Sequence, residues 1–170
     1  MNGEDYLLPD YYTKRILILG CGNRLFGDDG FGPAVIDHLC SHYEIPDDVY
    51  VMDVGTGVRK VFLTLRYSER LPQQIVIVDA VEKGKTPGEI FELSIDDIPK
   101  EKKDDFFFHQ APSSNLAKDL KTMGVDIHVL ACQVAHIPDT VEEGLSQPVA
   151  EAAVRVCEHI ARKYSMQIKH

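Results

Sequence analysis

The chain has 170 residues, of which 44% are hydrophobic and 26% are charged, a composition typical of one globular domain with a sizeable core. Its formal net charge of -9 argues against binding to nucleic acid or to anionic membrane surfaces, because both need clustered Lys and Arg. No apolar run approaches the roughly 20 residues of a membrane span, and residues 1–13 lack the pattern of a signal peptide. We therefore expect a single cytoplasmic domain over residues 1–170, with residues 1–13 as an extended arm.

Strand and helix patterns alternate along most of the chain. Residues 15–19 are a short apolar run, typical of a strand buried on both faces, and Gly20 and Gly22 then permit a sharp turn. The same reasoning predicts strands at 49–54, 75–78, 89–93 and 128–134, a solvated charged loop or short helix at 96–105, and helices at 33–43, 58–67, from Ser113 or Ser114 to 123, and after Ser146. This order predicts a three-layer α/β fold: a mostly parallel, twisted five-stranded sheet with an antiparallel edge strand and helices on both faces.

The four cysteines are scattered and form no CxxC pair, which indicates neither a zinc knuckle nor a thioredoxin-like redox site. They are Cys21, Cys40, Cys132 and Cys157. The simplest interpretation is that they are buried thiols of a protein from a reducing compartment. Cys21 lies in the turn after the first strand, so a role there as nucleophile or ligand stays open.

The glycine-rich turn after the first strand is also where a dinucleotide would place its pyrophosphate. The GxGxxG spacing fails, since Leu25 stands where the third glycine is required. Asp28 and Asp29 moreover bring negative charge to the start of the next helix, where it would repel a phosphate. Only Asp53 matches the acid that would bind a ribose. The loop therefore suits a cation or a hydrogen-bond donor better than an anion.

Carboxylates stand at the ends of three predicted strands. Asp29 follows the first strand, Asp53 ends the second and Asp79 ends the third. Because the carboxyl ends of parallel strands meet at one edge of a sheet, we expect these side chains to converge there. Their mutual repulsion would be costly unless a metal ion or shared protons offset it. Helix capping is the competing role for Asp28 and Asp29, and we expect one of them to cap the following helix.

His109 is the expected third ligand. It follows three phenylalanines at 106–108, which can anchor its loop to the core and fix the direction of the imidazole. Two carboxylates and one imidazole with open positions suit nickel, zinc or iron better than magnesium or calcium. On spacing alone, the sequence therefore predicts a divalent-cation site formed by His109 and carboxylates from the group Asp29, Asp53 and Asp79.

Several short motifs are spread along the chain. They are GCGN at 20–23, GDDGFG at 27–32, DVGT at 53–56, DA at 79–80, PG at 87–88, HQ at 109–110 and GLS at 144–146. Together they resemble the nickel-iron hydrogenase maturation endopeptidases, and the resemblance runs from about residue 15 to the last helix. Within that family the general look is closest to archaeal enzymes that serve a deazaflavin-reducing hydrogenase.

The resemblance implies an enzyme that removes a C-terminal extension from a hydrogenase large-subunit precursor once nickel has been inserted. The family's nickel contacts fall on Asp29, Asp79 and His109, and the family's further acid near the cleft falls on Asp53; supporting positions are Gly20, Gly22, Asn23 and Asp28. The nickel would arrive with the precursor, and zinc or another divalent ion could stand in for it. Two departures are Asp29, where some relatives have Glu, and residues 131–134, which lack the proline often found after that strand.

Two mechanisms and one alternative class stay open. The three residues could dock onto nickel held by the precursor's cysteines, or they could hold a permanent zinc ion in a plain metallopeptidase. A serine or cysteine protease is not indicated, because no Ser or Cys stands in a recognisable nucleophile turn. The alternative is a nonenzymatic nucleotide- or nickel-binding regulator or carrier. A carrier would be expected to show a His-rich or Cys-rich tract, and this sequence has none.

Overall fold

A five-stranded sheet runs through the centre of the protein, which is represented by a computed structural model that describes residues 10–97 and 112–170. Its strand order is β3-β1-β4-β6-β5. The strands are β1 (Ile16–Cys21), β3 (Val49–Gly55), β4 (Gln74–Val81), β5 (Ile90–Leu93) and β6 (Asp126–Gln133). β1 pairs in parallel with β3 and β4, β4 pairs in parallel with β6, and β5 pairs antiparallel to β6 at the edge. The predicted mostly parallel sheet with an antiparallel edge strand is confirmed.

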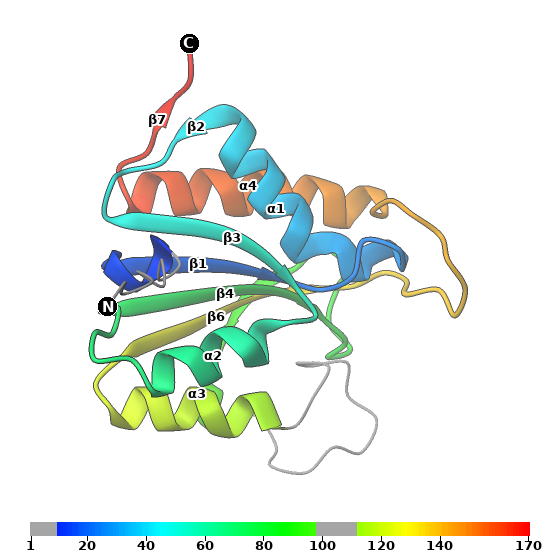
Figure 1. Ribbon diagram of the computed structural model, residues 1–170. Helices are drawn as coiled ribbons and strands as arrows, with labels where there is room; N and C mark the ends of the chain where they lie inside the picture. The colour runs from blue at the N-terminus through cyan, green and yellow to red at the C-terminus, as the bar shows by residue number, and fades with distance from the viewer. Residues whose placement is uncertain (1–9, 98–111) are drawn as a thin grey trace, which may run out of the picture.

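Helices cover both faces of this sheet, as Figure 1 shows. α1 (Phe31–His42) and α4 (Gln147–Lys163) pack on one face, and α2 (Val58–Arg66) and α3 (Pro112–Thr122) pack on the other. Side chains of β1 alternate between the two cores, since successive residues of a strand point to opposite faces. Leu17 and Leu19 join the core beneath α2 and α3, while Ile16 and Ile18 join the core beneath α1 and α4. The central strand is therefore buried on both faces, as its unbroken apolar run predicts.

Several element boundaries differ from the prediction. β4 continues through Asp79 to Val81, and β3 continues through Asp53 to Gly55, so both aspartates lie inside strands. The predicted strand at 49–54 already contained Asp53, but the one at 75–78 stopped before Asp79, where backbone pairing continues with Asp79 opposite Ala131. α3 begins at Pro112, so Ser113 and Ser114 fall inside the helix and the prediction that one of them precedes it was wrong.

Smaller elements complete the described chain. A two-stranded antiparallel pair, which the sequence did not predict, joins β2 (Tyr43–Glu44) to β7 (Gln167–Ile168). Two 3-10 turns, η1 (Asp10–Thr13) and η3 (Ile95–Asp97), lie at the borders of the described segments. The turn η1 contradicts an extended conformation for the last residues of the predicted arm. Residues 1–9 and most of the predicted charged loop lie outside the described residues. Within the described residues, none of the helices combines the length and apolar character that crossing a membrane requires.

At the edge of the sheet, the side chain of His128 connects β6 to the edge strand β5. His128 of β6 contacts the carboxylate of Glu92 on β5, and its other ring nitrogen lies 2.8 Å from Asp126. Partial burial lowers the pKa of His128, but the hydrogen bonds to the two carboxylates outweigh it and raise the pKa above its usual value. The imidazole of His128 therefore links β5 to β6.

The start of α1 lies directly against the end of β1. A side chain at Gly32 would come within 2.2 Å of the backbone oxygen of Cys21 and within 2.5 Å of that of Val78. Such close approach of a helix to two strands requires glycine. It fixes the loop between β1 and α1 at the carboxyl edge of the parallel strands, where open α/β sheets bind their ligands.

Candidate functional site

The loop after β1 is folded tightly over the start of α1. Gly22 has a φ of +131°, and a side chain there would lie 1.9 Å from the backbone oxygen of Asp29. The following residue, Asn23, donates its backbone N–H to that same oxygen and to Oδ2 of Asp29, at 3.1 and 3.0 Å. Gly22 therefore lets the chain turn close enough for Asn23 to orient the Asp29 carboxylate.

Asp29 and Asp79 form a buried pair of carboxyl groups at this edge. Asp29 lies in the 3-10 turn η2 (Gly27–Gly30) and is 3% exposed, while Asp79 of β4 is 2% exposed. Burial, and then the charge of Asp29, raise the pKa of Asp79 well above its usual value, although a 2.8 Å hydrogen bond from the Ala80 N–H opposes the change. A cation placed between the two groups would relieve this repulsion and favour ionised Asp79.

Cys21 lies within the electrostatic reach of this pair. Its side chain is 3% exposed, and its pKa is raised well above the usual value by burial, then by the charges of Asp79, Asp53 and Asp29. Among the residues that the structure describes, a thiolate here would face carboxylates and would lack the positive neighbours that activate a catalytic cysteine. The geometry therefore favours a packed thiol over a nucleophile at this position.

Asp53 is held differently from the other two carboxylates. Its Oδ2 accepts a 2.7 Å hydrogen bond from Nη2 of Arg24, and its Oδ1 accepts the Gly55 N–H at 2.8 Å. Arg24 also contacts Asp37 of α1, so one guanidinium joins the glycine loop to β3 and α1. The guanidinium of Arg24, which Asp53 shares with Asp37, thus partly compensates the charge of Asp53. The expected convergence of three uncompensated carboxylates reduces in the structure to the pair Asp29 and Asp79.

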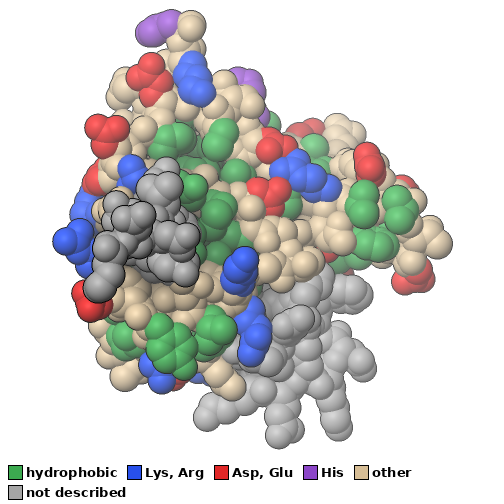
Figure 2. All heavy atoms as spheres, viewed as in Figure 1, with side chains coloured by type: hydrophobic (Ala, Val, Ile, Leu, Met, Phe, Trp, Pro, Cys, Tyr) green, Lys and Arg blue, Asp and Glu red, His purple; other side chains and the backbone are tan. Residues whose placement is uncertain are grey.

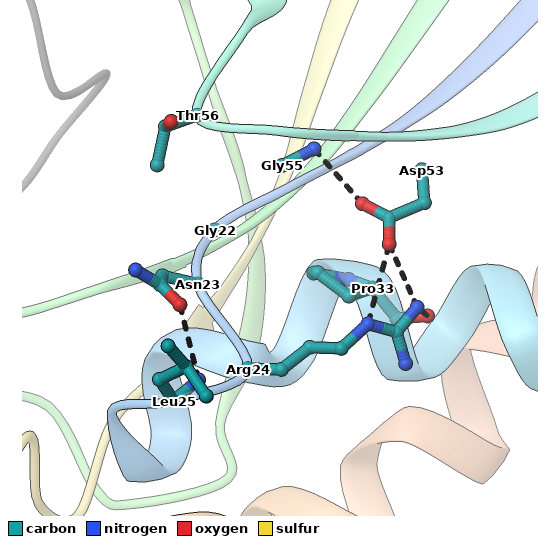
Figure 3. A pocket seen from close by; sticks show the side chains of 8 residues that line it. All are labelled: Gly22, Asn23, Arg24, Leu25, Pro33, Asp53, Gly55 and Thr56. Carbon is teal, nitrogen blue, oxygen red and sulfur yellow. Dashed lines mark hydrogen bonds and ion pairs between the residues drawn. The ribbon is translucent and has the colours of Figure 1, made fainter. Parts of the chain in front are cut away.

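A hollow of about 370 Å³ opens beside Arg24 (Figure 3). Loop residues form one wall, and the end of β3 forms the other; the lining residues are Gly22, Asn23, Arg24, Leu25, Pro33, Asp53, Gly55 and Thr56. The guanidinium of Arg24 points across this space to Asp53. Because it adjoins the loop that carries Asp29, the hollow offers room for a substrate segment next to the acid pair.

Asp28 has a role that its neighbour does not share. Its fully buried carboxylate accepts backbone N–H groups from Ala135, His136 and Ser146 at 2.7–3.0 Å, and the Ser146 hydroxyl at 2.9 Å. The prediction that Asp28 or Asp29 caps the next helix is therefore wrong, because α1 has Gly30 at its N-cap with no side-chain cap. Ser146 is the N-cap residue of α4, as expected, but its hydroxyl bonds to Asp28 and not to the helix backbone. Asp28 holds the segment between β6 and α4 in place.

The structure describes only part of the predicted ligand set of Asp29, Asp79 and His109. His109 and the phenylalanines before it lie outside the described residues, so His109 stays a prediction. Within residues 10–97 and 112–170, no three His, Cys, Asp or Glu side chains are arranged to hold a metal ion together. The described part of the site therefore supplies two of the three predicted ligands, the carboxyl groups of Asp29 and Asp79.

Sequence reasoning did not predict the contacts of two residues that shape this site, Arg24 and Asp28. The ion pairs of Arg24 join positions 13 and 29 residues apart, and no local pattern predicts such partners. The role of Asp28 depends on a segment more than 100 residues later. A doubled aspartate in a glycine-rich turn was the available signal, but local sequence does not distinguish an anchor from a ligand.

The fold and site together define a class: α/β proteins with a mostly parallel sheet and buried acids in the crevice at its carboxyl edge. Solved structures share the fold. The HybD hydrogenase-maturating endopeptidase of E. coli superposes with a TM-score of 0.70 at 23% identity, covering 91% of this chain and 96% of that one. The HycI maturation protease of Thermococcus kodakarensis superposes with a TM-score of 0.68 at 27% identity, covering 89% and 93%.

Sequence comparison identifies the family. Residues 33–163 match the hydrogenase maturation proteases. A Methanocaldococcus jannaschii protein assigned to the hydrogenase maturation proteases is 39% identical over 149 residues, covering 86% of this chain and 94% of its own. The coenzyme F420 hydrogenase subunit delta of Methanothermobacter thermautotrophicus is 35% identical over 153 residues, covering 88% and 94%. The chain belongs to the hydrogenase maturation protease family, and it is therefore a peptidase rather than a nonenzymatic binder.

Proposed function

We propose that this protein cleaves the C-terminal extension from the large-subunit precursor of a nickel-iron hydrogenase after nickel insertion. In this proposal Asp29, Asp79 and His109 contact the nickel that the precursor carries, and the contact places the scissile peptide for hydrolysis. A carbonyl or water polarised by the metal would then react. The relative from M. thermautotrophicus named as a coenzyme F420 hydrogenase subunit supports a deazaflavin-reducing hydrogenase as the source of the precursor.

The buried pair of Asp29 and Asp79 is the observation that carries the proposal. Two carboxyl groups that are almost fully buried raise each other's energy when both are charged, and Asp79 bears that effect in its raised pKa. A divalent ion would remove the penalty on ionising Asp79. Two carboxylates and the imidazole of His109 would leave coordination positions open, which fits an ion that the substrate already holds.

Recognition of substrate-bound nickel and a permanent zinc ion predict different cleavage. The experiment uses purified protein stripped of metal and two forms of the precursor, one loaded with nickel and one without it, with the product mass measured. Recognition of nickel predicts cleavage of the loaded form only. Cleavage of both forms after zinc is restored, and of neither before, would instead support a resident zinc site.

Variants test the residues themselves. Asp29→Asn, Asp79→Asn and His109→Ala are each expected to lower the cleavage rate by at least about a hundredfold, the scale on which removing one electrostatic contact to a reacting group acts. Asp47→Asn is a matched control, because Asp47 is exposed in the turn before β3, at the opposite edge of the sheet. Full activity in the three site variants would refute the proposed site.

A further inference from the structure

The segment between β6 and α4 extends away from the body of the molecule beside the candidate site (Figure 1). We call residues 135–146 the projection. Buried Asp28 binds both of its ends, through Ala135 and His136 at one end and Ser146 at the other. The four hydrogen bonds that this carboxylate accepts hold the two ends of the projection at a fixed distance from each other.

The middle of the projection is also fixed to the glycine loop. Glu142 donates its backbone N–H to the Leu25 oxygen at 2.9 Å and accepts the Gly27 N–H at 2.7 Å, which forms a parallel bridge. Pro138 is buried against Gly27, where a side chain would come within 2.8 Å of the proline ring. The projection is therefore attached along its length to the loop that carries Asp29.

Its outer surface combines apolar and acidic side chains. Val141 is 65% exposed and Leu25 is 43% exposed, and they directly precede Glu142 and Phe26, the two residues that the parallel bridge pairs. Exposed carboxylates of Asp139, Glu142 and Glu143 lie along the same segment. Figure 2 shows the hydrophobic side chains of the projection bordered by acidic ones. Exposed apolar side chains on a segment that hydrogen bonds hold in place are typical of a surface that a partner protein covers.

We infer that the projection and Leu25 form a docking surface for the hydrogenase large-subunit precursor, at a place where the precursor presents an apolar side chain next to Lys or Arg. This inference rests on the proposed function. The precursor is the occupant because the projection is hydrogen-bonded to Leu25 and Gly27, in the loop that carries Asp29, so a precursor bound at the acid pair comes close to it. The exposed carboxylates of the projection would pair with Lys or Arg of the precursor, and its exposed apolar side chains would contact an apolar side chain of the precursor.

Binding of nickel-free precursor tests this surface apart from cleavage. The full-length protein is titrated with nickel-free precursor, and Kd is measured at two salt concentrations. Val141→Ser is expected to weaken binding about tenfold, or about 1.4 kcal/mol. Glu143→Lys is expected to weaken binding at low salt and to reduce its salt dependence. Ile168→Ser is the control, because Ile168 is 67% exposed on β7, far from the site, and its Kd should match wild type.

The outcomes separate this inference from the proposed function. If the wild type cleaves nickel-loaded precursor while Val141→Ser and Glu143→Lys bind within twofold of wild type, the docking surface is refuted and the proposed function stands. The same holds if the wild type cleaves loaded precursor but does not bind the nickel-free form. Self-association that Val141→Ser abolishes, with unchanged precursor binding, would assign the surface to a second copy of this chain. A wild type that neither binds nor cleaves precursor overturns both.

Discussion

Replacing Asp28 by asparagine tests whether this residue is an anchor. In the wild type, Oδ1 accepts the Ser146 N–H, and Oδ2 accepts the Ala135 and His136 N–H groups and the Ser146 hydroxyl. An asparagine would keep three of these bonds if its oxygen took the Oδ2 position. Its NH₂ group would then point at the Ser146 N–H, a donor facing a donor. The variant therefore loses one buried bond and the charge on the other three.

The magnitude follows from that loss. A buried donor left without an acceptor costs about 1–3 kcal/mol, and hydrogen bonds to a charged group are worth more than neutral ones, so Asp28→Asn should lower the free energy of unfolding by about 2–4 kcal/mol. Asp139→Asn is the control in the same segment. Its side chain is exposed, so its free energy of unfolding should stay within about 0.5 kcal/mol of wild type.

Two measurements check the prediction. Urea unfolding gives the global change, and amide hydrogen exchange reports whether the N–H groups of Ala135, His136 and Ser146 open locally. A loss of about 2 kcal/mol corresponds to roughly thirtyfold faster exchange if the projection opens on its own. An unfolding free energy within 0.5 kcal/mol of wild type, together with unchanged exchange at these three amides, would show that Asp28 is not an anchor.

Three other variants probe the site and the sheet edge. The pKa of Asp79 is raised in the folded state, so ionising this group destabilises the fold as pH rises above about 4; Asp79→Asn should be more stable than wild type at pH 7 by urea unfolding, with the difference shrinking toward pH 4. Gly22→Ala combines backbone strain with a collision against Asp29, and it should lose more stability than Gly124→Ala, where φ is +98° but no atom lies within 4 Å; equal losses would refute the collision. The raised pKa of His128 stabilises the fold below about pH 6.5 and the effect disappears as pH rises through the folded-state pKa, so His128→Gln should be more destabilising at pH 6 than at pH 9 in thermal unfolding.

Hydrophobic periodicity predicts the sheet well because burial dictates it. β1 and β4 are buried on both faces, so each appears in the sequence as an apolar run. The ends of elements were predicted less well. β4 continues through Asp79 because backbone pairing with β6 does not need an apolar side chain, and β2 and β7 are too short to show a period. Local sequence therefore identifies which segments are strands better than it identifies where they end.

The acid pair could be predicted in part, because strand order determines which residues meet. Parallel strands place their carboxyl ends at one edge, which brings Asp79 near the loop after β1. The ion pair of Asp53 could not be predicted, since it is made with Arg24, 29 residues away, through a contact that no spacing rule anticipates. His109 stays a prediction, as its segment is outside the described residues. Strand order therefore brings carboxylates together, and tertiary contacts decide which of them keep an uncompensated charge.

The two consecutive aspartates illustrate how a tight turn gives neighbouring residues different roles. In a 3-10 turn, successive side chains point about 120° apart, so Asp28 and Asp29 face different parts of the protein. Asp28 meets four hydrogen-bond donors, which satisfy a buried carboxylate without any ligand. Asp29 faces another buried carboxyl group, Asp79, whose raised pKa registers the repulsion. A buried acid surrounded by donors is stable as it stands, whereas an acid beside another acid is stabilised by a cation. This difference in surroundings, and not the sequence motif, assigns anchoring to Asp28 and supports the proposed cation contact of Asp29.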